Sequence, residues 1–281
     1  MSDLIRLSDI GVDYAIPRQG RKKVLADLSL TIRTSEFIAV CGQTGCGKST
    51  MLRLILGAEK PTCGKVLING SELPRPDRHR GYVPQKYSLF PDKTVLGNIM
   101  FGPEMEEFGI LGRLSPRFFR RRQEIRSEAY RLLAQMGLQE SDALKYPDQL
   151  SGGMQQRVAI AQALIMHPQI LLMDEAFSAL DPGTRAEMQR LIRSVWANAG
   201  TTVLFVTHNI AEAIFLASRI VVLGKKDAGG SSNVLLDLDV PEEARTQSGY
   251  LRREELERLT RLIETAAMGG QPELRLVEFG G

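Results

Sequence analysis

The stretch that decides the fold reads Glu36-Phe-Ile-Ala-Val-Cys41, then Gly42-Gln-Thr-Gly-Cys-Gly47-Lys48-Ser49-Thr50, then a helical pattern from Met51 to Leu56. Its first part is continuously apolar, as a strand buried on both faces is. Its second part fits G-x-x-x-x-G-K-[ST], where glycines let backbone N–H groups turn toward a phosphate and the next helix adds its positive end. Lys48 can reach the β- and γ-phosphates of a nucleotide, and Ser49 can ligand Mg²⁺. The stretch therefore predicts a strand, a phosphate-binding loop and a helix.

On both sides of this loop, strand patterns alternate with helical patterns. Two alternating runs, Leu4–Tyr14 and Val24–Ile32, flank the polar turn Ile16–Lys23 and predict antiparallel strands. Four further strands of the buried type are predicted at Val66–Ile68, Ile170–Met173, Thr202–Val206 and Ile220–Leu223. Helices are predicted at Arg122–Met136, Gly152–Met166, Thr184–Ala197 and Asn209–Leu216. This order predicts an α/β fold with a mainly parallel core sheet, an antiparallel β-subdomain and, at about residues 94–160, a helical subdomain.

Two predicted strands end in side chains that suit phosphate chemistry. Ile170–Met173 runs into Asp174 and Glu175, and ligands of open α/β sheets bind at the carboxyl ends of strands. Asp174 can organise a Mg²⁺ shell, and Glu175 can orient or deprotonate a water beside the γ-phosphate. The strand Thr202–Val206 ends in Thr207 and His208, which places a histidine at the same edge. Taken alone, each of these polar groups is also explained by a strand whose end is exposed to solvent and has no catalytic role.

The segment Leu150-Ser-Gly-Gly-Met-Gln-Gln-Arg157 resembles the signature sequence of ATP-binding cassette (ABC) ATPases. Ser151 can cap the helix that follows, and the N–H groups at Gly152 and Gly153 form an anion site. The resemblance extends from residue 4 to about residue 223. It implies the ABC type of phosphate-loop nucleotidase fold, and it implies that the chain hydrolyses ATP with Mg²⁺.

The resemblance also assigns roles to individual residues. It implies that Glu175, His208 and Gln85 are catalytic, and that Ser49, Gln85 and Asp174 hold the metal. Tyr14 is similar to the aromatic residue that stacks on adenine, Gln85 to the glutamine of the Q-loop and Asp181 to the aspartate of the D-loop. The nucleotide-binding set that the resemblance implies is Tyr14, Gly42, Gln43, Thr44, Gly45, Cys46, Gly47, Lys48, Ser49, Thr50, Ser151, Gly152, Gly153 and Asp181.

Two positions depart from the usual family pattern. Ala176 stands where proline commonly follows the catalytic glutamate, which frees the backbone after Glu175 but leaves its carboxylate in place. Thr44 replaces the commoner serine in the phosphate loop, where backbone N–H groups matter more than the side chain. Neither departure argues against ATP hydrolysis.

The resemblance further implies partners. ABC ATPases act as head-to-tail pairs, so the phosphate loop of one copy faces Ser151 and Gly153 of a second copy or of a related subunit. One cassette without a membrane span is typical of a separate ATPase subunit that serves integral membrane permease subunits, with a solute-binding protein in the complex. The expected location is therefore peripheral, at the cytoplasmic face of the cell membrane.

Within the family, several segments are most similar to the nitrate, sulfonate, taurine and urea-type uptake branch. They are Ser88–Pro91, the LSGGMQQR form of the signature, Asp181–Arg185 and a short C-terminal extension around Val234–Asp239. Two alternatives stay open: a lipid or efflux ATPase with its own permease, and a cassette ATPase without a transport role that acts on ribosomes or DNA. The latter usually has two cassettes or a long coiled coil, and this sequence shows neither.

The composition of the chain argues against several classes of protein. The 281 residues include 36 Lys plus Arg and 33 Asp plus Glu, and this small net charge of +3 disfavours nucleic-acid binding by bulk charge. The three cysteines, Cys41, Cys46 and Cys63, have no metal-ligand spacing, so we expect neither a zinc site nor a disulfide framework and infer a reducing compartment. We expect no signal peptide and no membrane span, because charges are scattered through the N-terminus and no apolar run reaches 18 residues.

Two segments raise expectations of their own. Residues Gly112–Arg126 hold six arginines around Phe118 and Phe119, which predicts a basic insertion that faces a permease or an anionic membrane; a solvated basic helix is the alternative. The predicted ATPase domain covers residues 1–225. Residues 226–281 form a predicted extension, with a linker in Lys225–Asn233, a weak strand at Val234–Val240 and a helix at Gly249–Ala267. On this view a chain that ends near Lys226 keeps nucleotide binding, unless the last helix packs on the core.

Overall fold

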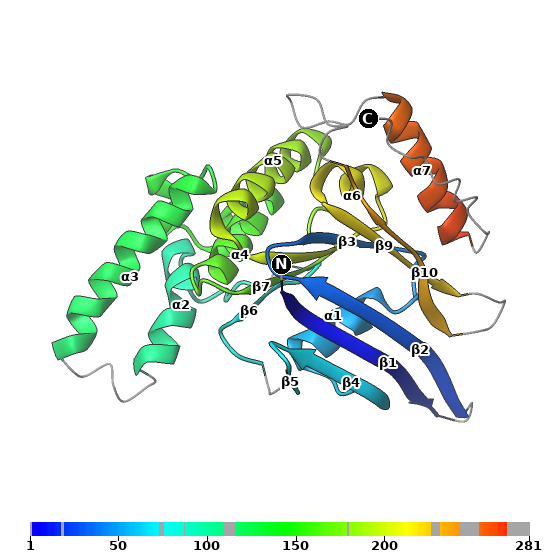
Figure 1. The fold of residues 1–281 in the computed structure, drawn as a ribbon. Helices are drawn as coiled ribbons and strands as arrows, with labels where there is room; N and C mark the ends of the chain where they lie inside the picture. Colours follow the sequence, from blue (N-terminus) through cyan, green and yellow to red (C-terminus); the bar gives the residue numbers. More distant parts are fainter. Residues whose placement is uncertain are drawn as a thin grey trace. The chain divides into compact units, whose positions relative to one another are not determined.

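The computed structural model describes residues 2–17, 20–72, 76–86, 88–108, 116–178, 180–225, 231–241 and 253–268. They form two compact units (Figure 1). The first unit combines residues 1–75 with residues 204–281, and the second spans residues 76–203. None of the described helices has the length and apolar character that a bilayer-crossing segment needs.

The first unit is built on a mixed sheet. Its strands are β1 (Asp3–Ile16), β2 (Gly20–Arg33), β3 (Phe37–Cys41), β4 (Cys63–Ile68), β5 (Ser71–Glu72), β9 (Arg219–Lys225), β10 (Ser232–Asp239) and the last three residues of β8 (Thr202–Val206). Their order in the sheet is β5-β4-β1-β2-β10-β9-β3-β8. β1, β2, β4 and β5 pair antiparallel, whereas β3 and β9 pair in parallel. The sheet therefore joins the predicted antiparallel part to the predicted parallel part.

The predicted hairpin is confirmed, but its turn is shorter than expected. Residues 20–23 of the polar stretch belong to β2, where Gly20 faces Ile16 and Lys22 faces Tyr14. These polar side chains are exposed, so the strand continues past the point where its apolar alternation stops. The alternation of apolar residues predicts a strand only as far as its side chains are buried. Here backbone pairing with β1 extends the strand into exposed residues.

Three helices complete the described part of the first unit: α1 (Lys48–Leu56), α6 (Ile210–Leu216) and α7 (Arg253–Ala267). α7 buries Leu259, Ile263 and Ala266, whose spacing places them on one helix face. That face packs against α6 and β9 (Figure 1). The predicted C-terminal helix is therefore confirmed over residues 253–267, and its first predicted residues, 249–252, lie outside the described residues.

The segment after β9 is an integral part of this unit. β10 pairs antiparallel with β9 from Ser232 opposite Lys225 to Asp239 opposite Arg219. The ends of the predicted linker belong to these strands, and its residues 226–230 lie outside the described residues. A chain that ends near Lys226 would lose β10 and α7 together, so we now expect it to be poorly folded rather than competent to bind nucleotide.

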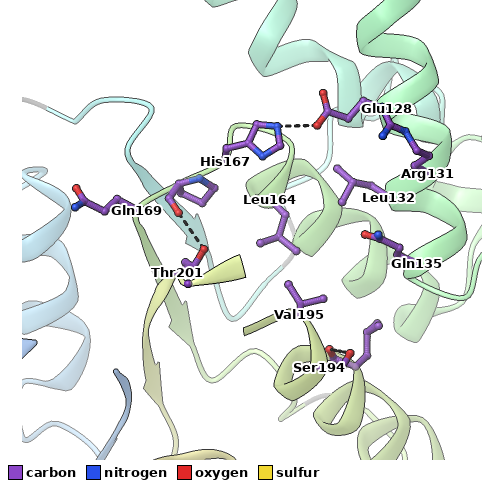
Figure 2. A pocket seen from close by; sticks show the side chains of 13 residues that line it. Glu128, Arg131, Leu132, Gln135, Leu164, His167, Gln169, Ser194, Val195 and Thr201 are labelled. Carbon is purple, nitrogen blue, oxygen red and sulfur yellow. Dashed lines mark hydrogen bonds and ion pairs between the residues drawn. The ribbon is translucent and has the colours of Figure 1, made fainter. Parts of the chain in front are cut away.

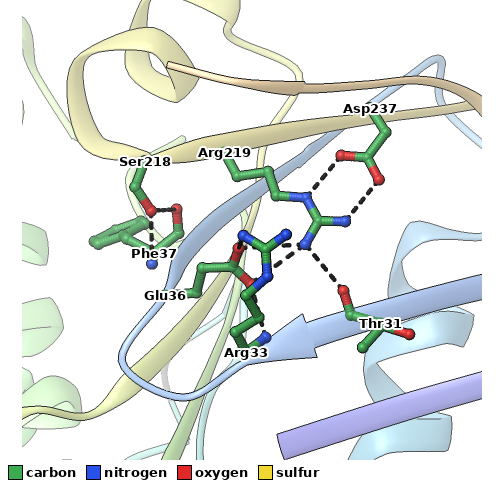
Figure 3. A network of polar contacts seen from close by, with 7 residues as sticks. All are labelled: Thr31, Arg33, Glu36, Phe37, Ser218, Arg219 and Asp237. Carbon is green, nitrogen blue, oxygen red and sulfur yellow. Dashed lines mark hydrogen bonds and ion pairs between the residues drawn. The ribbon is translucent and has the colours of Figure 1, made fainter. Parts of the chain in front are cut away.

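A half-buried polar network ties β10 to the rest of the sheet (Figure 3). The Arg219 guanidinium donates to both carboxylate oxygens of Asp237 at 2.7 and 2.6 Å, to the Thr31 carbonyl at 2.9 Å and to Glu36 at 3.2 and 3.3 Å. Its hydrogen bond to Asp237 is the main cause that raises the pKa of Arg219. Glu36 is 7% exposed and also accepts from the Arg33 N–H at 2.8 Å. The network thus joins β2, β9 and β10 around one buried carboxylate.

Replacing Arg219 by Met should lower the free energy of unfolding by about 3 kcal/mol, at the low end for a buried ion-pair partner left uncompensated. We expect the low end of this range of destabilisation because Glu36 would still accept a hydrogen bond from the Arg33 N–H in the variant. The measurement is urea unfolding followed by circular dichroism. As a control, Arg253→Met removes an ion pair to Glu257 whose arginine is 91% exposed, and should cost less than about 1 kcal/mol. Equal losses in the two variants would show that the network does not hold the sheet together.

The second unit contains β6 (Arg80–Val83) and β7 (Ile170–Asp174), which pair in parallel. Its helices are α2 (Val95–Phe108), α3 (Pro116–Gln135), α4 (Gly152–Leu164) and α5 (Pro182–Ala199), with short 3₁₀ turns η2 (Glu140–Leu144) and η3 (Pro147–Gln149). In the described part of residues 94–160 every regular element is helical, as the sequence predicts. The sequence does not predict β6, which has only four residues, and it predicts α2 only as part of the helical subdomain, without bounds, because the burial of α2 is not confined to one stripe.

Two arginines of α3 pair with carboxylates of α2. Arg121 donates to Glu107 at 2.8 to 3.0 Å and to Glu124 at 2.6 Å, and Arg122 donates to Glu104 at 2.7 Å. Phe118 is buried and stacks edge-on against Phe108 of α2, whereas Phe119 is 67% exposed. These pairs hold α2 and α3 side by side (Figure 1), so Arg121 and Arg122 are not spare charges for a membrane. The predicted membrane- or permease-facing surface reduces to Arg117, Phe119, Arg120 and Arg126, and residues 112–115 lie outside the described residues.

A cleft of about 650 Å³ opens in the second unit between α3, the end of α4 and α5 (Figure 2). His167 sits on its rim with φ +49° and contacts the Glu128 carboxylate through Nε2 at 2.6 Å. Apolar side chains such as Leu132, Leu164 and Val195 line its wall. None of the residues that the sequence predicts for the functional site lines this cleft.

Candidate functional site

The predicted phosphate loop lies between β3 and α1, in the strand–loop–helix context that its motif requires. Gly42 has φ +146° and Gly47 has φ +92°, both in the region that favours glycine. A Cβ atom at Gly42 would lie 2.1 Å from the Leu223 carbonyl oxygen, and one at Gly47 would lie 2.6 Å from Leu25. Glycine is therefore required at both positions, and the chain can turn its N–H groups inward at the start of α1.

Lys48 is the first residue of α1 and is 6% exposed. Its ammonium donates to the Gly42 carbonyl at 2.7 Å and to the Gln43 carbonyl at 3.0 Å. The lysine thus closes the loop on itself and holds a positive charge at the helix N-terminus. Gln43, Thr44 and Gly45 form the exposed crest of the loop, and Ser49 and Thr50 continue into the helix.

Tyr14 reaches the same helix from β1. Its hydroxyl lies 3.4 Å from the Thr50 hydroxyl and accepts from Arg53 at 3.2 Å. This hydrogen bond from Arg53 is the first cause that raises the pKa of Arg53. The structure therefore brings the predicted adenine-stacking residue beside the predicted phosphate loop, within one unit.

Cys41 precedes the loop and Cys46 lies within it, and both are buried. Burial raises the pKa of Cys41 to about 12, and it also raises the pKa of Cys46, while the nearby Lys48 opposes the shift in both cases. Near neutral pH both side chains are thiols. They therefore leave the positive charge of Lys48 available to an anion.

The acidic pair of the second unit lies at the end of β7. This strand is buried along its whole length, and Asp174, its last residue, is 8% exposed. Glu175 follows with φ +46°, a strained conformation for a residue with a side chain. Its carboxylate accepts from the Gln85 amide at 3.0 Å. Two of the predicted catalytic residues, 90 positions apart in sequence, are therefore in direct contact.

The signature segment begins α4. The Ser151 hydroxyl caps this helix by accepting from the Met154 N–H at 3.3 Å. A Cβ atom at Gly153 would lie 2.7 Å from the Thr184 methyl group of α5, so this glycine permits close packing of the two helices. Asp181 caps α5 through bonds from the N–H groups of Gly183 and Thr184, both at 3.1 Å, and its pKa is lowered first by the hydrogen bond from the Thr184 side chain.

His208 follows β8 and is exposed, and the residues around it form a tight network. The Thr207 hydroxyl donates to the Glu212 carboxylate at 2.9 Å and accepts from the Asn209 N–H at 3.0 Å. Sequence reasoning missed Thr207 and Glu212 as functional candidates. The spacing Asn209-Ile-Ala-Glu212, which is that of a capping box, was the signal that could have found them.

The predicted site residues thus fall into two groups. The first unit holds Tyr14, residues 42–50 and His208; the second holds Gln85, residues 151–153, the pair Asp174–Glu175 and Asp181. Within each unit the structure assembles members of the set that lie far apart in sequence.

Comparisons with known proteins show which family the chain resembles. The family described as "ABC transporter" matches residues 25–178. The nitrate import ATP-binding protein of Synechococcus elongatus is 39% identical over 83% of this chain and 81% of its own length. The taurine import ATP-binding protein of Roseobacter denitrificans is 32% identical over 96% of this chain and 98% of its own length.

Among solved structures, an ATP-binding cassette in a dimeric post-hydrolysis state, bound to ADP and phosphate, matches with a TM-score of 0.70 and 32% identity. The match covers 85% of this chain and 99% of that chain. The two chains therefore share their overall fold. The chain therefore belongs to the ABC transporter family, as one of its ATP-binding, ATP-hydrolysing subunits.

Proposed function

We propose that this subunit powers the import of a small solute of the nitrate, sulfonate, taurine or urea type through a separate membrane permease. The observation that carries the proposal is the similarity, over most of the chain, to proteins named as nitrate and taurine import ATP-binding proteins. The proposed ATPase domain is residues 1–225, with its helical subdomain at about residues 94–160. Residues 226–281 form a proposed extension, whose β10 and α7 contact β9 within the first unit.

The residues present suit MgATP. Residues 42–50 supply backbone N–H groups at the start of α1 and the Lys48 ammonium for the β- and γ-phosphates. Ser49, Gln85 and Asp174 offer a hydroxyl, an amide and one carboxylate, and Mg²⁺ commonly takes such a small protein set together with phosphate oxygens and water. When bound, Mg²⁺ neutralises charge on the transferred phosphoryl group. Tyr14 offers its ring to the adenine.

Glu175 is the proposed general base. Its carboxylate can accept the proton of a water that attacks the γ-phosphate, while Asp174, one residue earlier, would hold the metal. Gln85 donates to Glu175 and so fixes the direction of the carboxylate. His208 is proposed to act on the γ-phosphate side of the same reaction.

The working unit is proposed to be a head-to-tail pair, in which Ser151, Gly152, Gly153 and Asp181 of one copy act on the nucleotide held by the other. Ser151 caps the N-terminus of α4, so its hydroxyl lies beside the N–H groups that begin this helix. The positive N-terminal end of a helix suits a negatively charged ligand. The dimeric state of the matching solved cassette supports this pairing. Permease subunits, a solute-binding protein and a place at the cytoplasmic face of the membrane complete the proposal.

Growth of the parent cell tests the imported solute class. Deleting the gene should abolish growth when nitrate is the only nitrogen source, or when taurine or another sulfonate is the only sulfur source. The wild-type chain should restore growth, as should the exposed control Glu264→Gln, whereas Glu175→Gln should not. Normal growth of the deletion strain on all of these sources, urea included, would contradict import of this class. New sensitivity to toxic lipophilic compounds would instead support the efflux alternative.

A further inference from the structure

We propose that Glu212 is a positioning residue for ATP hydrolysis. Its side chain fixes the loop that holds His208, and this loop is bonded to β3, the strand that ends beside the phosphate loop. The inference rests on the proposed role of His208. It adds a residue that the family motifs described above do not include. All the contacts that carry it lie within the first unit.

The loop around His208 is closed by three hydrogen bonds. The Thr207 hydroxyl donates to Glu212 Oε2 at 2.9 Å, and the same hydroxyl accepts from the Asn209 N–H at 3.0 Å. Asn209 Oδ1 accepts from the Glu212 N–H at 3.2 Å. Thr207 and Asn209 are the two neighbours of His208 in the chain, so the histidine backbone is held from both sides. Its side chain remains exposed.

This closed loop is anchored to the strand that feeds the phosphate loop. The Thr207 N–H donates to the Val40 carbonyl of β3 at 3.2 Å, and β3 ends one residue later at Cys41. Burial is the main cause that raises the pKa of Cys41, and the negative charge of Glu212 adds to the rise. Glu212 thus links the position of His208 to the start of residues 42–50.

Helix capping alone does not account for Glu212. Asn209 already caps α6, so the side-chain carboxylate is not needed to satisfy that helix N-terminus. Glu212 is 5% exposed, and burying a carboxylate is costly unless its oxygens are bound. The hydrogen bond from the Thr207 hydroxyl to Glu212 Oε2 offsets part of the cost of burying this carboxylate.

The test compares Glu212→Ala, Glu212→Gln and Thr207→Val in the purified full-length chain. Glu212→Ala should lower kcat of ATP hydrolysis about 10- to 100-fold, the range for a modest misplacement of a reacting group, with KM for ATP within about threefold of wild type. Glu212→Gln keeps an oxygen for the Thr207 hydroxyl and should restore kcat to within about threefold. Thr207→Val should resemble Glu212→Ala, and the double variant should be no worse than either single variant.

Three results overturn the inference. One is a wild-type kcat in Glu212→Ala. Another is a parallel loss of kcat, ATP affinity and thermal stability in all three variants, which would show a structural role only. The third is a failure of Glu212→Gln to restore kcat although it folds. The exposed control Glu264→Ala should behave as wild type. A wild-type chain that does not hydrolyse ATP at all would overturn the proposed function, and this inference with it.

Discussion

Glu175→Gln should lower ATP hydrolysis by a factor of about 10² to 10⁴, the usual contribution of general acid–base catalysis, and should leave ATP binding intact. The substitution removes the base but keeps the shape of the side chain. A glutamine oxygen can still accept from the Gln85 amide, which lies 3.0 Å from the carboxylate in the wild type. The groups proposed to bind the nucleotide, including Lys48 and the loop backbone, are not altered.

The backbone at Glu175 makes this substitution a clean test. Its φ of +46° costs on the order of 1–3 kcal/mol for a residue with a side chain, and glutamine carries much the same cost. Folding should therefore change little, as thermal unfolding can verify. Phosphate release measures hydrolysis, and a fluorescent ATP analogue measures binding. The exposed control Glu264→Gln should hydrolyse ATP normally; normal hydrolysis by Glu175→Gln would show that the base has been assigned to the wrong residue.

Lys48→Ala should behave differently, because it should weaken ATP binding itself. The ammonium is held over the loop by the carbonyls of Gly42 and Gln43 and is proposed to contact the β- and γ-phosphates. Loss of a charge-assisted contact costs about 1.5–3 kcal/mol, so affinity should fall on the order of 10- to 100-fold. Equilibrium titration with the fluorescent analogue gives this ratio.

Lys65→Ala is the matched control for this titration. Lys65 lies on β4 and pairs with Glu72, and both side chains are more than half exposed. Removing it changes the net charge by the same amount as Lys48→Ala but touches no proposed nucleotide contact. Its affinity for ATP should equal that of the wild type. An equal loss of affinity in the two variants would assign the effect to overall charge rather than to the loop.

Much of the fold follows from short stretches of sequence. The continuous apolar runs at residues 37–41 and 170–173 became strands buried along their whole length, and the second strand extends to Asp174. Gly42 and Gly47 adopt the positive φ values that the phosphate-loop motif requires, and Ser151 caps α4 as its position predicts. These features are local, so neighbouring residues are sufficient to determine them.

The contacts that could not be predicted are those between distant positions. The bond from Gln85 to Glu175 spans 90 residues, and the bond from Arg219 to Glu36 spans 183. The weak strand near Val234 becomes an inner strand of the sheet because β9 pairs with it, which its own sequence does not show. The left-handed backbone at Glu175 likewise has no local signal such as glycine or asparagine.

The central claim is that this chain hydrolyses ATP in a closed pair with Glu175 as the base, and static light scattering of Glu175→Gln tests it most directly. With saturating ATP and Mg²⁺, the variant should bind nucleotide, fail to turn it over and double in mass, to a dimer that holds two ATP molecules. Without ATP, or with Lys48→Ala added, the mass should stay that of the monomer. A variant that binds ATP but stays monomeric, or one that hydrolyses ATP at the wild-type rate, would contradict the account.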